Sequence, residues 1–246
     1  MKNIAEIFRE NGIEIFGVCS LQSLKLLPCR KQIPSTGSAV VCLFPYRVKK
    51  MAPTVLSRFA AVKDYHQVIG EILGGVTDAL EELFPDNEFI SLADNSPVPE
   101  VYAAYRAGLG HIGRNGLLIN DIYGSYCFIG EIVTDLVLEE SVPANDSCGS
   151  CNACSHVCEL DKTKCISRIN QRQTLTKEEE QRVKESGHIW GCDDCQECCP
   201  KNVTAKLSTL PQFVETYNEK IAPGDSTRVY HWRKEAIIRN MDLLGN

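Results

Sequence analysis

The sequence has no excess of basic residues. Its 26 lysines and arginines stand against 32 aspartates and glutamates, which gives a formal net charge of −6 over 246 residues. A chain with this balance has no general positive field for holding nucleic acid, although a local basic patch is compatible with it. Binding of RNA or DNA is therefore not the default expectation.

Long uninterrupted apolar runs are absent as well. No segment has the roughly eighteen apolar residues that a membrane-spanning helix needs. The first twenty residues also lack the uncharged core of a signal peptide, because they include Lys2, Glu6, Arg9, Glu10 and Glu14. These absences predict a cytoplasmic protein with no membrane partner.

Cysteine, in contrast, is abundant and unevenly placed. Nine of the 13 cysteines lie between residues 148 and 199. Thiols in a reducing compartment stay reduced, so this clustering is not a disulfide framework. Binding of a metal or an iron–sulfur cluster is the leading explanation.

The region before these cysteines alternates between helical and extended patterns. We expect helices at 3–11, within 54–83 and at 97–108, and strands at 14–19, 38–44, 88–92, 116–120 and 126–134. This order predicts an α/β or α+β domain over residues 1–140. A polar stretch then leads into a cysteine-rich domain over 141–222, and residues 223–246 end in a helix at 229–244.

The first cysteine motif is C-x2-C-x2-C-x3-C, formed by Cys148, Cys151, Cys154 and Cys158. Three thiolates on such a tight loop bind three irons of one cubane cluster, while the fourth points to a neighbouring cluster. This spacing is highly specific for iron–sulfur proteins. The proline that usually follows the fourth cysteine is replaced by Glu159.

The second motif resembles the end of a bacterial ferredoxin motif, with Cys165 as the upstream ligand it otherwise lacks. Its members are Cys192, Cys195, Cys198 and Cys199, followed by Pro200. The ferredoxin exchange rule predicts two 4Fe-4S clusters. The first would be bound by Cys148, Cys151, Cys154 and Cys199, and the second by Cys158, Cys165, Cys192 and Cys195. Spacing alone leaves open that Cys198 replaces Cys165.

Two other interpretations explain less of the sequence. Zinc prefers two separated C-x2-C pairs, such as Cys148/Cys151 with Cys192/Cys195, which leaves the other cysteines of both motifs without a role. A dinucleotide site is suggested by GLGHIG at 108–113, but a helical pattern precedes this segment where a strand is required. The remaining Cys19, Cys29, Cys42 and Cys127 are expected to be small core residues.

Several longer segments resemble the epoxyqueuosine reductase family. They are ADNSPVPEVYAAYRAGLGHIGRN at 93–115, YGSYCFIGEIVTD at 123–135, both cysteine motifs, KDYH at 63–66 and RNMDLLGN at 239–246. The resemblance implies a flavin-nitroreductase-like α/β domain that binds cobalamin, joined to a ferredoxin-like module with two clusters. It also implies that Cys165 is a ligand and Cys198 is not.

The resemblance further implies an activity and residues that perform it. In the family, electrons pass from an external donor of the ferredoxin or flavodoxin type through the clusters to cobalamin, which acts on an epoxide in a tRNA nucleoside. By position, Asp94 would donate the proton, and Tyr65, His66 and Ser125 would lie beside the cofactor. Proton donation near neutral pH requires a raised pKa for Asp94. The alternative is that Asp94 only forms a turn and caps the next helix.

The chain departs from the family pattern in three places. It stops at Asn246 where the family usually continues into helical repeats that help hold tRNA, Val101 stands where arginine is common, and the loop between Cys158 and Cys165 is short. Together with the acidic net charge, these departures favour a small-molecule or nucleoside substrate over tRNA. They also leave a second interpretation, a non-catalytic electron-transfer or corrinoid-handling protein that serves a partner enzyme.

Overall fold

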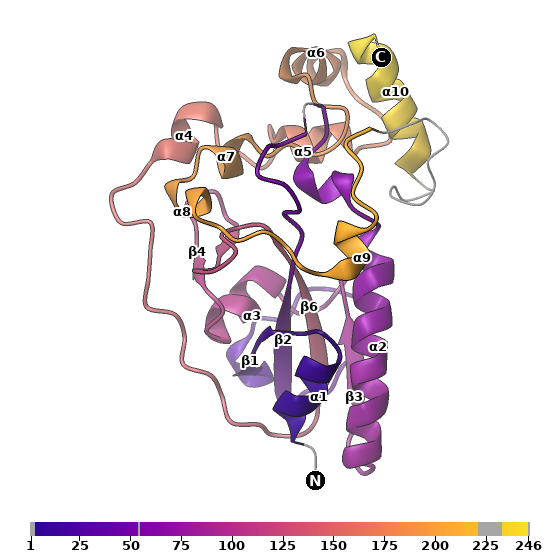
Figure 1. The fold of residues 1–246 in the computed structure, drawn as a ribbon, viewed down its shortest axis with the longest axis vertical. Helices are drawn as coiled ribbons and strands as arrows, with labels where there is room; N and C mark the ends of the chain where they lie inside the picture. The colour runs from indigo at the N-terminus through magenta and orange to yellow at the C-terminus, as the bar shows by residue number, and fades with distance from the viewer. Residues whose placement is uncertain (1–2, 54, 221–232, 246) are drawn as a thin grey trace. The chain divides into compact units, whose positions relative to one another are not determined.

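Residues 3–53, 55–220 and 233–245 are described in the computed structural model, and the chain groups into two units (Figure 1). The first unit comprises residues 1–45 and 65–149, and the second comprises residues 46–64 and 150–246. The sequence suggested a single boundary near residue 140, whereas in the structure residues 46–64 also group with the cysteine-rich part.

A four-stranded antiparallel sheet is the centre of the first unit. Its strand order is β1-β2-β6-β3, so the last strand in sequence inserts between two earlier ones. The unit contains α1 (Ile4–Glu10), β1 (Ile15–Ser20), η1 (Leu21–Ser23), β2 (Ser38–Pro45), α2 (Tyr65–Leu83), β3 (Phe89–Leu92), α3 (Glu100–Arg106), β4 (His111–Ile112), β5 (Leu118–Ile119) and β6 (Cys127–Thr134). This mixed architecture agrees with the α/β or α+β expectation.

Helices cover both faces of this sheet. On one face α2 packs closely on β6, because a Cβ atom added to Gly130 would lie 2.8 Å from Ile69 Cγ2 and 3.0 Å from Leu73 Cδ1. On the other face α3 packs on β1, β2 and β6, where Ala103, Ala104 and Val133 are fully buried. The first unit therefore has the layered core that the apolar strands predict.

The long helix α2 lies within the stretch where the sequence predicts it. Residues 54–83 were expected to contain a helix, and α2 occupies the part from Tyr65 onward, while residues 58–61 form the short 3-10 helix η2 (Arg58–Ala61). The residues before α2 belong to the second unit, in which Leu56 forms a parallel bridge with Trp190, and Ser57 N donates to Trp190 O at 2.9 Å. This long-range pairing accounts for the extended backbone at the start of the predicted stretch.

The second unit consists of short helices joined by loops. They are α4 (Ala153–Val157), α5 (Ile166–Asn170), α6 (Lys177–Ser186), α7 (Asp194–Glu197), α8 (Pro200–Val203), α9 (Pro211–Val214) and α10 (Lys234–Leu244). Buried asparagines tie the loops together: Asn240 Nδ2 donates to Asn170 O at 2.7 Å and to Ile189 O at 2.8 Å. Side-chain amides here satisfy backbone groups that strands would otherwise pair.

The expected C-terminal helix is present over part of its length. Residues 234–244 form α10, and its Ala236 and Ile237 pack with Leu56 and Trp190 in an apolar cluster. The first residues of the expected helix, 229–232, lie outside the described residues. Within the described ranges, every helix is too short or too polar to cross a bilayer.

Candidate functional site

The turn that follows β3 holds Asp94 and Asn95 in an unusual backbone conformation. Their φ angles are 53° and 39°, in the left-handed region that residues with side chains rarely adopt. The Asp94 N–H donates to Glu100 Oε1 at 3.0 Å, and the Cys29 thiol donates to Asn95 O at 3.5 Å. Strained non-glycine residues that are held by several contacts are concentrated at functional sites.

The start of α2 brings Tyr65 and His66 to this turn. His66 Nε2 lies 3.1 Å from Asp94 Oδ2, and the side chain of Asp94 is 60% exposed. Tyr65 stacks on Phe128 of β6, with ring centroids 4.2 Å apart and an interplanar angle of 13°. Two residues that the sequence proposed for cofactor contact, His66 and Asp94, are therefore paired, and Tyr65 is fixed beside them.

The pKa of Asp94 is shifted in the opposite direction from that expected of a residue that donates a proton near neutral pH. Its hydrogen bond with His66 lowers the pKa of Asp94, and this outweighs the opposing effect of burial. The sequence analysis required a raised pKa for this carboxyl. In this arrangement the charged form of Asp94 is favoured, so any proton it delivers must be supplied to it by other groups.

Two glutamates near Asp94 were missed by the sequence analysis. Burial, followed by the charge of Asp94, raises the pKa of Glu100 to about 7. Glu131 on β6 is fully buried, and burial followed by the charge of Glu100 raises its pKa well above the usual value. A glutamate inside the apolar run FIGEIVT was the sequence signal, because an unpaired carboxyl is rare in a buried strand.

Ser125 and Val101 have different surroundings. Ser125 lies just before β6 and is only 5% exposed, and its contact with a cofactor stays a prediction. Val101, which stands where arginine is common in the resembling family, is partly buried against the apolar core of the first unit. Its packing explains why an apolar residue is tolerated there.

The described cysteines are all free of disulfides, and those of the two motifs are partly exposed. In the second unit, α4 carries Cys154 and packs against α7, which carries Cys195. Cys198 lies near Cys154 and Cys199, since both raise its pKa. Thiols that form no disulfide and are gathered on facing short helices are a donor set that suits an iron–sulfur cluster.

Backbone N–H groups also point at motif sulfurs. Leu160 N donates to Cys158 Sγ at 3.4 Å in the second unit. In the first unit, to which Cys148 belongs, Arg114 N donates to Cys148 Sγ at 3.4 Å. Hydrogen bonds to sulfur stabilise thiolate charge and tune cluster potentials, so these contacts also fit cluster ligands.

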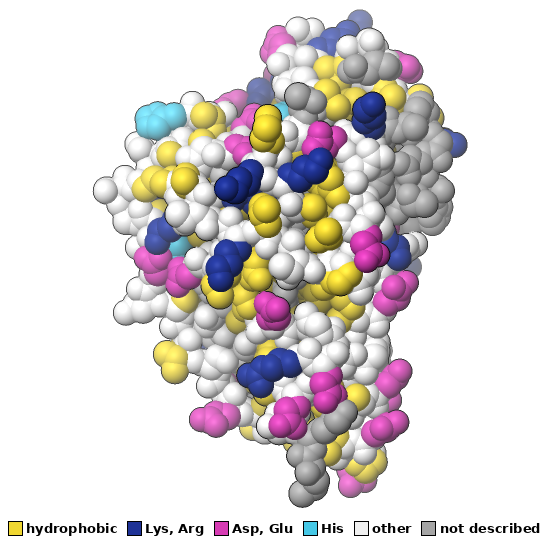
Figure 2. All heavy atoms as spheres, viewed as in Figure 1, with side chains coloured by type: hydrophobic (Ala, Val, Ile, Leu, Met, Phe, Trp, Pro, Cys, Tyr) yellow, Lys and Arg dark blue, Asp and Glu magenta, His cyan; other side chains and the backbone are white. Residues whose placement is uncertain are grey.

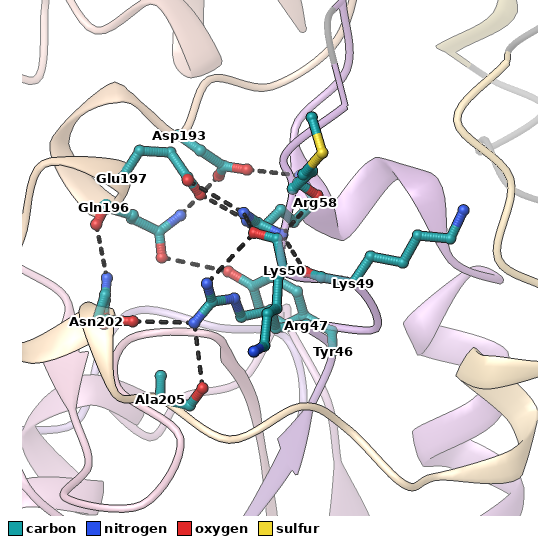
Figure 3. A network of polar contacts seen from close by, with 11 residues as sticks. Tyr46, Arg47, Lys49, Lys50, Arg58, Asp193, Gln196, Glu197, Asn202 and Ala205 are labelled. Atoms are coloured by element: carbon teal, nitrogen blue, oxygen red, sulfur yellow. Dashed lines mark hydrogen bonds and ion pairs between the residues drawn. The ribbon is translucent and has the colours of Figure 1, made fainter.

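A buried arginine holds the second cysteine motif in place (Figure 3). Arg58 is 2% exposed and binds Glu197 on α7 through Nε at 2.5 Å and Nη2 at 3.0 Å, while its backbone N donates to Asp193 Oδ2 at 2.6 Å. Burial raises the pKa of Asp193 to about 6 against the lowering effect of Arg58. Residues 46–64 thus support the helix that carries Cys195, a role that the sequence did not reveal.

A cavity with three arginines lies beside Cys165, the N-cap residue of α5. It has a volume of about 440 Å³ and is lined by Cys165, Ser167, Arg168, Gln171, Arg172 and Arg233. Arg172 pairs with Glu179, whereas Arg168 is exposed. The cavity is therefore positively charged next to a predicted cluster ligand.

Three cysteines outside the two motifs have different surroundings. Cys19 and Cys42 are buried on β1 and β2 as expected, but Cys29 contacts Asn95 at the strained turn and is not a core residue. His188 Nε2 lies 3.1 Å from Asp194 Oδ1, and together with Cys192 Sγ these ligand atoms lie within 4.8 Å of one another. Cys192 of this group is also a predicted ligand of the second cluster.

No family model matches the chain, but curated relatives do. An epoxyqueuosine reductase from Gloeobacter violaceus is 33% identical over 238 residues, covering 87% of this chain and 74% of the relative. One from Leadbetterella byssophila is 33% identical over 207 residues, covering 80% and 68%. The chain belongs to the epoxyqueuosine reductase family. Its match to the Aliivibrio fischeri and Lactococcus garvieae epoxyqueuosine reductases spans only 56% and 44% of their length.

Solved structures of epoxyqueuosine reductases have the same fold as this chain. An epoxyqueuosine reductase with a tRNA-Tyr epoxyqueuosine-modified stem loop has a TM-score of 0.80 and 24% identity, covering 98% of this chain and 79% of that one. The Bacillus subtilis epoxyqueuosine reductase, described with an aspartate catalytic loop swung out of its active site, has a TM-score of 0.79 and 22% identity, covering 98% and 82%. A reductive dehalogenase linked to B12-dependent dehalogenation has a TM-score of 0.50 and 17% identity, covering 99% and 36%.

Proposed function

We propose that this chain is an iron–sulfur oxidoreductase in which two 4Fe-4S clusters pass electrons to cobalamin for reduction of an organic substrate. The observation that carries the proposal is the exposed Asp94 carboxyl, held on a strained turn and paired with His66. In this proposal the first unit is a nitroreductase-like cofactor domain, and the second belongs to a ferredoxin-like cluster module.

The clusters would be held by the ligand sets that the motifs predict. Cys154 on α4 and Cys195 on α7 come from helices that pack together, and Arg58 fixes α7 through Glu197. Bound clusters would supply one-electron carriers for the reaction. The contribution of the chain is to hold the thiols in position and to direct N–H groups at their sulfurs, as Leu160 N does toward Cys158.

Tyr65, His66 and Asp94 would face bound cobalamin, which would supply a strongly reducing cobalt centre. Removal of an epoxide oxygen to give an alkene consumes two electrons and two protons and releases one water. Asp94 would hand a proton to the departing oxygen, since its side chain is 60% exposed and accessible to a reactant. His66 would orient the Asp94 carboxyl.

For the substrate, we propose a nucleoside or another small molecule that carries the reducible group. The net charge is −6, and on the face shown in Figure 2 the basic side chains are scattered among acidic and apolar ones. The solved relative with a tRNA-Tyr stem loop keeps tRNA among the candidates. Comparison of turnover on an epoxyqueuosine-modified stem loop and on the free nucleoside distinguishes the two.

An acidic electron donor of the ferredoxin or flavodoxin type would fit the arginine cavity beside Cys165. Arg168, Arg172 and Arg233 give that surface a positive charge within reach of a predicted cluster ligand. Complementary charge steers association and fixes the orientation of the two partners. Electrons would then enter at the second cluster.

The test of the proposed function is Asp94→Asn in anaerobically reconstituted protein. The proposal predicts loss of turnover of about 100-fold or more, with unchanged reduction of the clusters by dithionite. Asp86→Asn, an exposed change of the same type, is the matched control and should leave turnover intact. Turnover that survives Asp94→Asn would contradict the role of Asp94 as proton donor. Electron transfer to a partner that is unchanged by Asp94→Asn, in protein with no turnover of its own, would support the alternative, a carrier that delivers electrons or corrinoid to a partner enzyme.

A further inference from the structure

Two carboxyl groups of the first unit lie near the strained turn that holds Asp94. Glu100, the first residue of α3, accepts the backbone N–H of Asp94 at 3.0 Å. Glu131 lies on the face of β6 that α3 covers, together with Ile129 and Val133. One carboxyl thus fixes the backbone of the proposed proton donor, and another lies buried behind it.

The buried position of Glu131 dictates its protonation state. The residue has no exposed surface, and the hydrogen-bonding effect of the Ser96 hydroxyl on its carboxyl is far smaller than the effect of burial. A buried charge with so little hydrogen bonding is costly, so the neutral acid is strongly favoured. The O–H of that acid needs an acceptor, and the carboxyl of Glu100 is the neighbour with the largest electrostatic effect on it.

The charged and titratable groups around this pair come from several elements. Glu100 faces Asp94 and, from α2, His66. Glu131 faces Glu100, Asp94 and the hydroxyl of Ser96, and the positive charge of Lys31 acts in the opposite sense to the two carboxylates. From β1 and β2, the thiols of Cys19 and Cys42 also lie within its field. Two neighbouring acids with one weak counter-charge hold at least one proton between them.

We infer that Glu100 is a positioning residue and proton reservoir, which clamps the Asp94 turn through the Asp94 N–H and stores, with Glu131, the proton that Asp94 delivers. This inference rests on the proposed function. One proton moves from the carboxyl pair to the Asp94 carboxylate and then to the departing oxygen, the second proton that completes the released water comes from solvent, and the two electrons come from the external donor through the clusters. The pair is reprotonated from solvent after each turnover.

Because Asp94 is ionised in the folded chain, it must receive a proton from a neighbouring group before it can donate one. The hydrogen bond with His66 lowers the pKa of Asp94, so this residue alone holds few protons near neutral pH. Glu100, whose pKa burial raises to about 7, is protonated in a large share of the molecules near neutral pH. Wild-type turnover is therefore expected to decline as the pH rises through about 7.

The first test is the pH dependence of kcat for Glu100→Gln. The amide oxygen still accepts the Asp94 N–H, so the turn is kept, whereas the stored proton is lost. We expect kcat to fall about 10- to 100-fold and the decline near pH 7 to disappear. Glu81→Gln, an exposed change on α2, is the matched control and should keep the wild-type profile. A Glu100→Gln profile that matches wild type, in protein that Asp94→Asn inactivates, overturns the inference and leaves the proposed function standing.

The second test needs no turnover and uses the full chain without added cofactor. Infrared spectroscopy detects the C=O stretch of a protonated carboxyl directly. We expect one such band to titrate near pH 7 and to be absent in Glu100→Gln, and a second band to persist above that pH and to be absent in Glu131→Gln. A wild-type protein with no protonated carboxyl between pH 6 and 8 overturns the inference, even where a variant fails to fold.

Discussion

Arg58 binds Glu197 with two nitrogens of its guanidinium, Nε at 2.5 Å and Nη2 at 3.0 Å, although the two residues are 139 positions apart in the sequence. The other Arg58 nitrogen, Nη1, donates to the carbonyls of Lys49 and Met51. A guanidinium group whose three nitrogens all donate hydrogen bonds is held rigidly. Arg58 therefore fixes the helix α7 between the cysteines of the second motif.

Replacement of Arg58 tests this attachment. In Arg58→Met the Glu197 carboxyl loses its guanidinium partner, whereas Asp193 keeps the backbone N–H of residue 58, and we expect the free energy of unfolding to fall by about 2–4 kcal/mol. We also expect iron to be lost from the second motif, measured per chain after anaerobic reconstitution. Arg9→Met, the same change at an exposed position of α1, should retain wild-type iron and stability. Full iron content in Arg58→Met would contradict the supporting role.

The choice between Cys165 and Cys198 is tested by single serine variants. Family resemblance assigns Cys165 as a ligand, and the Cys198 thiol lies 3.6 Å from the carbonyl of Cys195, which it can donate to without a cluster. Cys165→Ser is expected to lose about half of the iron and one of two reduced-cluster signals in electron paramagnetic resonance. Cys198→Ser should keep both, and the reverse pattern would exchange the two assignments.

The carboxyl pair in the first unit predicts a pH dependence of stability. Glu100, and more strongly Glu131, bind their protons more tightly in the folded chain than at the ordinary pKa of 4.5. The contribution of Glu100 to stability is therefore fully present below pH 4.5 and is lost as the pH rises through about 7, whereas that of Glu131, whose pKa is raised further by its complete burial, persists to higher pH. Glu131→Gln should shrink the difference in unfolding free energy between pH 5.5 and 8 by about 1–3 kcal/mol.

That prediction is measured by chemical denaturation at the two pH values. Glu82→Gln, an exposed change on α2, should leave the difference as in wild type. A Glu131→Gln variant whose stability changes with pH as much as wild type would show that Glu131 is ionised in the folded chain.

The arginine cavity predicts how the electron donor binds. Arg168→Glu should raise the KM for an acidic ferredoxin or flavodoxin about 10-fold, because it places a negative charge in that cavity. Reduction of the clusters by dithionite, a small donor that needs no docking, should be unchanged. The control is Arg9→Glu, the same charge reversal in the other unit, which should leave the KM for the donor unchanged. An equal effect of both variants would indicate a net-charge effect without a docking site.

The sequence predicted the regular elements of the first unit well because their patterns are local. The alternation and apolar runs that form β1, β2 and β6 depend on residues adjacent in the chain. The excursion of residues 46–64 could not be predicted this way, because it depends on pairing of Leu56 with Trp190 and on Gly191, where a Cβ atom would lie 1.9 Å from Ser57 Oγ. Long-range contacts of this kind leave no periodic signal.

The candidate site was predicted in part. Motif spacing identified the cysteines, and family resemblance identified Asp94 and His66, which are indeed paired. The roles of Glu100, Glu131 and Arg58 were missed, because each depends on burial that sequence spacing does not reveal. The expected direction of the Asp94 pKa was also wrong, since the His66 hydrogen bond that lowers it joins residues 28 positions apart.

The most direct test of the account is anaerobic purification followed by iron, sulfide and cobalt analysis with an absorption spectrum. After reconstitution with cobalamin, the account predicts about eight irons and eight sulfides per chain, one retained corrinoid, and its reduction to cobalt(I) by a low-potential donor. A colourless protein with zinc in place of iron would contradict the cluster assignment. Full clusters with no corrinoid retained would contradict the proposed cofactor.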